Sequence, residues 1–204
     1  LLGRCRRSNM AIYASRAGNF DENAVRQLGQ QFGLTRMDAN WLAGEQGVTR
    51  IKVCAADGLR NAYIPYTDRA IKWHTDGYYN PPERQVLSMI LHCAQSAGQG
   101  GENRLMDHEI AYLMLRDANS DFIRALSAPD AMTIPQRTDE QGIARAAQTG
   151  PVFSIDPASG GLHMRYTART RSIMWKQDAT TLAAVAMLEK LLASDSPHIH
   201  RARL

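Results

Sequence analysis

One short segment of this 204-residue chain brings together side chains that can bind a metal ion: Trp73-His74-Thr75-Asp76. Side chains two positions apart on an extended strand point to the same face, so His74 and Asp76 can present an imidazole nitrogen and a carboxylate oxygen to one point in space. Two histidines and one carboxylate form the facial triad that holds Fe(II) and leaves coordination positions open. The pair would supply two of those three ligands. The plain alternative is a structural surface pair, because His-x-Asp also occurs by chance.

Further motifs extend from about residue 50 to residue 171, over half of the chain. In chain order they are Trp73-His74-Thr75-Asp76, Pro81-Pro82, Leu91-His92-Cys93, Gly100-Gly101-Glu102-Asn103, Leu105-Met106-Asp107, Gly150-Pro151-Val152-Phe153 and Leu162-His163-Met164-Arg165-Tyr166. In order and spacing this set resembles the Fe(II)/2-oxoglutarate dioxygenases of the taurine dioxygenase and gamma-butyrobetaine hydroxylase superfamily. The combination is far more specific than any of its parts.

The resemblance implies a double-stranded β-helix, or jelly roll, with flanking helices. It implies iron held by His74 and Asp76 at the end of one strand, with 2-oxoglutarate as cosubstrate and dioxygen as oxidant. The residue after the family's Gly-Gly-acid triplet is commonly Thr or Ser and helps to hold 2-oxoglutarate. Here that position is Asn103. An amide offers both a donor and an acceptor, so we expect Asn103 to hold 2-oxoglutarate, or else to be a turn residue that caps the next element.

The third iron ligand has no obvious candidate among the other histidines, His92, His108, His163, His198 and His200. In the family a distal histidine is followed about ten residues later by an arginine that clamps 2-oxoglutarate, and only four residues follow His200. We therefore expect the distal histidine and its arginine beyond Leu204, or absent. The expected unit is one oxygenase-like domain over residues 1–204, truncated at both ends and incomplete at the C-terminus of the jelly roll.

Two further residues are candidates for contacting the substrate. Tyr78 follows the metal motif, which is His74-Thr75-Asp76, and could line the pocket, although core or surface packing explains it equally well. Arg165 belongs to a basic run with Arg169 and Arg171 that could face an anionic substrate or cosubstrate, although such runs usually lie in water.

The remaining pattern predicts the elements that would position these residues. Apolar spacing favours a helix over 20–32, and Asp107, Ser120 and Asp178 can begin three more helices. Extended segments are expected at residues 48–54, 70–74, 86–94, 131–135, 151–155, 162–166 and 198–204, with a turn at 156–161. We take 86–94 to be a buried strand. Short strands with segregated helices predict a β-rich α+β fold.

Composition and charge exclude several classes of protein. The chain is 44% hydrophobic and 22% charged, as ordinary globular proteins are. Its net charge of +4 arises at its ends, since residues 1–16 and 197–204 hold six of the 24 Lys and Arg and no acid, which leaves 18 bases against 20 acids. We therefore expect no nucleic-acid partner. No apolar run is long enough to span a membrane, and three widely spaced cysteines favour a reducing cytoplasm.

The sequence favours an enzyme that hydroxylates a small molecule and releases succinate and CO2, an oxidoreductase. The alternative is a non-catalytic jelly-roll binding protein, an enzyme relic without the third ligand. A zinc hydrolase is less consistent with the sequence, because it lacks His-Glu-x-x-His and Cys-x-x-Cys patterns. Substrate identity and assembly into a homo-oligomer stay open.

Overall fold

A computed structural model describes residues 1–16, 21–38, 47–54, 63–139, 142–169, 171 and 173–203. The chain divides into two compact units. The first comprises Leu1–Lys72 and Ser88–Ser96, and the second comprises Trp73–Leu87 and Ala97–Leu204. His74 and Asp76, and every other predicted site residue, belong to the second unit.

The first unit contains two α-helices and a short 3-10 helix among its described residues: α1 (Leu2–Ser8), α2 (Glu22–Gln31) and η2 (Ile64–Tyr66). The Asp21 side chain accepts a hydrogen bond from the Ala24 N–H and so caps α2. This confirms the helix that apolar spacing predicts there, with Asp21 at its start.

Three helices of the second unit begin at side-chain caps. They are α3 (His108–Ala118), α4 (Ser120–Leu126) and α5 (Ala179–Ala193), capped by Asp107, Asn119 and Asp178. The caps at Asp107 and Asp178 confirm the prediction. The cap expected at Ser120 is wrong by one residue, because the Asn119 side chain accepts from the Asp121 N–H and Ser120 is the first helical residue.

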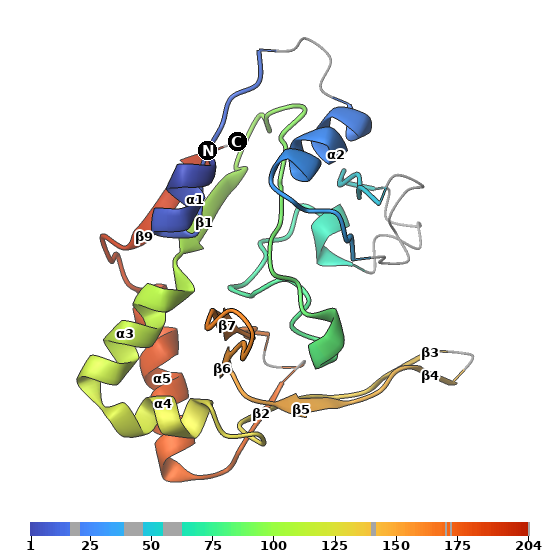
Figure 1. Ribbon diagram of the computed structural model, residues 1–204. Coiled ribbons are helices and arrows are strands. Elements are labelled where there is room, and N and C mark those ends of the chain that lie inside the picture. Colours follow the sequence, from blue (N-terminus) through green and yellow to red (C-terminus); the bar gives the residue numbers. More distant parts are fainter. Residues whose placement is uncertain are drawn as a thin grey trace. The chain divides into compact units, whose positions relative to one another are not determined.

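The strands of the second unit form four small antiparallel sheets. They are β1 (Glu102–Met106) with β9 (Ile199–Arg203); β2 (Met132–Ile134) between β5 (Gln148–Gly150) and β8 (Met174–Trp175); β3 (Arg137–Asp139) with β4 (Gly142–Arg145); and β6 (Phe153–Ile155) with β7 (Leu162–Met164). Figure 1 shows β1 beside β9, and β3 and β4 as a ribbon that continues from β2 and β5. A short 3-10 helix, η3 (Pro82–Arg84), follows the metal motif.

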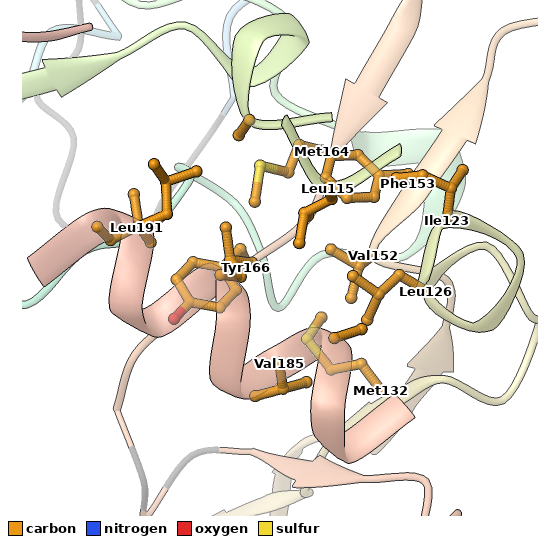
Figure 2. Close-up of a cluster of buried hydrophobic side chains, with 14 of the residues drawn as sticks. Leu115, Ile123, Leu126, Met132, Val152, Phe153, Met164, Tyr166, Val185 and Leu191 are labelled. Carbon is orange, nitrogen blue, oxygen red and sulfur yellow. The ribbon is translucent and has the colours of Figure 1, made fainter. Parts of the chain in front are cut away.

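One hydrophobic cluster joins α3, α4 and α5 to β2, β6 and β7 (Figure 2). Leu115, Leu126 and Leu188 are fully buried in it. Each such leucine contributes roughly 1.5–3 kcal/mol through removal of its apolar surface from water. Trp73 and Tyr78, on either side of the metal motif, pack against this cluster. The core therefore supports the segment that carries His74 and Asp76.

The described residues form a mixed α and β structure, with more residues in helices than in strands. The mixture of helices and strands is as predicted, but the described residues are not β-rich. They form no closed barrel, so they do not confirm the jelly roll. No regular strand is found at residues 48–54, 70–74 or 86–94, where the sequence favoured strands. The last of these was expected to be buried, yet Leu87 is 78% and Met89 61% exposed. An apolar run becomes a buried strand only where neighbouring strands pair with it, and within the described residues none does so.

Candidate metal centre

The segment Trp73–Thr75 is held by pairing with residues 166–168, although it forms no long strand. His74 and Thr167 form an isolated antiparallel bridge. On either side of it, the Ala168 N–H donates to the Trp73 carbonyl at 2.8 Å and the Thr75 N–H donates to the Tyr166 carbonyl at 2.9 Å. Thr167 is fully buried. Backbone pairing against a buried partner fixes the direction of the His74 side chain.

The two predicted ligands converge as their spacing suggests. His74 Nε2 lies 3.6 Å from Asp76 Oδ1, and the two side chains are 33% and 40% exposed. Two donors that each lie about 2.1 Å from one ion are separated by roughly 3–4 Å. The separation therefore fits one shared metal ion. A neutral imidazole nitrogen with a carboxylate oxygen is also the donor chemistry that Fe(II) takes in a facial triad.

A third ligand is not among the residues that the structure describes. Within those ranges, no group of three or more His, Cys, Asp and Glu side chains is placed to hold a metal ion. The described residues thus fit two positions of an iron site. The third ligand stays a prediction.

A tight turn fixes the direction in which the chain leaves Asp76. Gly77 has a φ of 65°, and the Asn80 N–H donates to its carbonyl at 2.8 Å. A Cβ at Gly77 would lie 2.6 Å from Val86 Cγ2 and 2.9 Å from Asn80 Nδ2. Glycine is therefore required here for two reasons: the backbone angle is unfavourable for other residues, and there is no space for a Cβ. The Asn80 side chain is buried and donates to the Arg84 carbonyl at 3.0 Å, which ties the turn to η3.

The turn carries two tyrosines that lie against each other. The Tyr78 and Tyr79 rings meet edge to face, with centroids 5.1 Å apart. Tyr78 packs on the hydrophobic core and Tyr79 is exposed. The Arg145 guanidinium, at the end of β4, lies 5.5 Å from the Tyr79 ring centroid. The packing explanation for Tyr78 is thus observed, and contact with a substrate stays a prediction.

Arg165 is engaged by the protein backbone. Its Nη2 donates to the carbonyls of Met132 and Gly150 at 2.8 and 3.2 Å, its Nε to Pro151 at 3.3 Å, and its Nη1 to Gln148 at 3.3 Å. These bonds use four of the five donors of a guanidinium. Burial lowers the pKa of Arg165 from its ordinary value. We therefore interpret Arg165 as a structural clamp on β2, β5 and the residues after β5, and no longer as a substrate contact.

Asn103 lies on β1, opposite Ala202 of β9. Its amide nitrogen donates to the Gly101 carbonyl at 3.2 Å. Gly100 and Gly101 both have positive φ, as a tight turn requires. Asn103 is therefore a strand residue whose side chain binds the turn before β1, and a contact with 2-oxoglutarate stays a prediction.

Arg104 is a neighbour of the metal motif that sequence reasoning missed. Its guanidinium carbon lies 5.3 Å from the centroid of a Trp73 ring, and its Nη2 donates to the Ser194 carbonyl at 3.3 Å. The cation thus fixes the tryptophan that precedes His74. The only signal in the sequence was its place directly after Asn103, which does not show what it contacts.

One of the remaining histidines joins two elements, and another is half-buried. The His108 Nε2 lies 2.9 Å from the Leu162 carbonyl and joins α3 to β7. His163 is half-buried on β7, and burial lowers its pKa, as do the nearby His108 and Arg165 charges.

A hollow of about 250 Å³ beside Thr167 is lined by Thr167, Ala168, Ile173, Trp175, Val185 and Glu189. Because neither His74 nor Asp76 lines this hollow, we do not assign the substrate to it.

A converging histidine and carboxylate are two of the three ligands in the facial triad of mononuclear non-haem iron enzymes. Residues 16–204 match the family described as "Taurine catabolism dioxygenase TauD, TfdA family". The chain therefore belongs to this family, and the resemblance drawn from its motifs is confirmed.

The chain is also similar to a uridine-5'-phosphate dioxygenase from Amycolatopsis sp, with 37% identity over 95 residues. The aligned part covers 47% of this chain and 33% of that protein, so the match spans about a third of the relative's length. Within the described residues, no helix has the length and apolar character to cross a membrane.

Proposed function

We propose that this protein is an Fe(II)- and 2-oxoglutarate-dependent oxygenase that hydroxylates a small molecule. The observation that carries the proposal is the 3.6 Å approach of His74 Nε2 to Asp76 Oδ1 in a chain of the TauD/TfdA family. The fold that we propose with this activity is a jelly roll, and the described sheets would be parts of it.

His74 and Asp76 would hold the iron as neutral imidazole and carboxylate. When bound, iron supplies the redox chemistry by which dioxygen oxidises 2-oxoglutarate to succinate and CO2, while one oxygen atom enters a C–H bond of the substrate. The bridge between His74 and Thr167 fixes the imidazole, and the Gly77 turn fixes the carboxylate and directs Tyr78 and Tyr79. Asn103 is our candidate for a hydrogen bond to 2-oxoglutarate.

Uridine 5'-phosphate is the first compound to test as a substrate, because the similar Amycolatopsis protein is a uridine-5'-phosphate dioxygenase. Uridine is the matched compound without the phosphate. We propose a small-molecule substrate and dioxygen as reaction partners.

The decisive experiment adds Fe(II) and 2-oxoglutarate to the complete protein without oxygen. We expect a visible charge-transfer band in the wild type that the Asp76→Ala variant lacks. Circular dichroism of both proteins controls for folding. A folded wild type without the band contradicts the proposal and favours the non-catalytic binding protein.

A further inference from the structure

The guanidinium of Arg145 lies against the segment that follows the ligand pair. Its Cζ atom is 5.5 Å from the ring centroid of Tyr79. Tyr79 is three residues after Asp76, and three residues span at most about 11 Å. A cation at the end of β4 therefore lies beside the turn that leaves the proposed iron site.

This guanidinium has a donor that the protein does not use. Its Nη2 donates to the Pro135 carbonyl at 2.8 Å, which anchors the group. Its Nη1 is buried and has no hydrogen-bond partner among the described residues. Leaving a buried donor without a partner costs about 1–3 kcal/mol, so such an atom points to a missing acceptor.

The charges around Arg145 indicate that the acceptor is an anion. Arg137 of β3 lies directly opposite Arg145 in the β3–β4 register. Like charges at such positions repel each other. Burial lowers the pKa of Arg145 most, the nearby Tyr78 and Tyr79 act in the opposite direction, and the Arg137 charge lowers it by a smaller amount. A bound anion would add negative charge beside these two arginines and accept the unused hydrogen bond of Arg145 Nη1.

We propose that Arg145 is a specificity-determining residue that binds a phosphate monoester group of the substrate. This inference rests on the proposed function, since it assigns the anion to the molecule that reacts beside His74 and Asp76. A phosphate monoester carries nearly two negative charges at neutral pH and has oxygens spaced for a guanidinium, so it matches paired arginines better than a single carboxylate does. The Tyr79 ring holds the guanidinium from one side.

The test is a titration of iron-free protein, followed through the arginine Nε–H signals in nuclear magnetic resonance spectra. The Arg145 signal is assigned from its loss in Arg145→Lys. We expect uridine 5'-phosphate to shift it saturably and uridine to leave it in place. Arg145→Gln should weaken binding of uridine 5'-phosphate by about 10- to 100-fold, the effect of losing a charge-assisted hydrogen bond. Arg116→Gln is the matched control, because it removes the same charge from an exposed residue of α3.

An Arg145 signal that moves with neither uridine 5'-phosphate nor inorganic phosphate overturns the inference, as does equal affinity of Arg145→Gln and wild type. Circular dichroism shows whether Arg145→Gln folds, and if it does not, the wild-type signal decides. The titration needs neither iron nor 2-oxoglutarate. A shifted signal with no charge-transfer band therefore counts against the proposed oxygenase and its substrate assignment, whereas a band with an unmoved signal counts against Arg145 alone.

Discussion

Thr75 and Tyr166 lie 91 positions apart in the sequence and exchange two hydrogen bonds. The Thr75 N–H donates to the Tyr166 carbonyl at 2.9 Å, and the Tyr166 N–H donates to Thr75 Oγ1 at 3.0 Å. Thr75 stands between the two proposed ligands, so this exchange ties the metal motif to the residues that follow β7. The placement of the two proposed ligands thus depends on Thr75, which is not one of them.

Replacing Thr75 by valine tests this dependence. Valine keeps the shape and removes the hydroxyl acceptor, which leaves the Tyr166 N–H without its partner in a residue only 2% exposed. We expect the free energy of unfolding to fall by about 1–3 kcal/mol. Fe(II) binding should weaken about 10- to 100-fold, as when a group that orients a ligand is lost. Thr75→Ser keeps the acceptor and should stay near wild type in both denaturant unfolding and metal titration.

Removal of either proposed ligand should abolish iron binding. His74→Ala and Asp76→Ala should each lower hydroxylation at least about 100-fold, since even groups behind the ligands contribute 10- to 100-fold. Fe(II) titration without oxygen measures the loss directly. His200→Ala is the control, because this exposed histidine of β9 lies opposite Leu105 and takes no part in the pair. Wild-type iron affinity in Asp76→Ala would contradict the assignment.

The turn at Gly77 should tolerate no side chain. Gly77→Ala places a Cβ 2.6 Å from Val86 Cγ2 in a residue with a φ of 65°. We expect a loss of about 1–3 kcal/mol in unfolding free energy together with weaker iron binding. Gly160→Ala is the matched control, since its φ is 70° but no atom lies within 4 Å of the added Cβ. Adding Val86→Ala to Gly77→Ala should restore part of the stability, and no recovery would place the effect in the backbone angle or in the contact with Asn80 Nδ2.

The local parts of this structure follow from the sequence. Asp21, Asp107 and Asp178 cap their helices because a short carboxylate satisfies N–H groups of the first turn, which depends on a few neighbouring residues only. The approach of His74 to Asp76 likewise needs only the period of an extended chain. The turn at 156–161 follows from Asp156, which accepts from the Ala158 and Ser159 N–H groups.

The parts that depend on distant residues could not be predicted in the same way. Residues 86–94 read as a buried strand, but a strand requires partners, and apolar character does not specify them. Arg165 reads as a surface or substrate charge because nothing local shows that four carbonyls surround it. No local motif in the sequence marks Arg145, because its place beside Tyr79 arises from the β3–β4 ribbon.

Arg165 should matter for stability and not for substrate recognition. Arg165→Gln removes the guanidinium that serves four backbone carbonyls, and we expect the free energy of unfolding to fall by about 2–3 kcal/mol. Arg169→Gln removes the same charge from an exposed residue and should change stability by less than about 0.5 kcal/mol. If Arg165→Gln folds with wild-type stability but binds the substrate more weakly, the clamp interpretation is wrong.

His163 should make the protein less stable in mild acid. Burial lowers the pKa of His163 below its usual 6.5, and the neighbouring His108 and Arg165 charges lower it further. The unfolded chain therefore takes up a proton at a higher pH than the folded protein does. Above about pH 6.5, His163 is neutral in both states and does not lower the free energy of unfolding. As the pH falls from there toward the lower pKa of the folded state, the free energy of unfolding declines. Denaturant unfolding at pH 7.5 and 5.5 measures this decline, which His163→Gln should reduce and His198→Gln, at an exposed position, should leave in place. An unchanged decline in His163→Gln would assign the acid sensitivity to other groups.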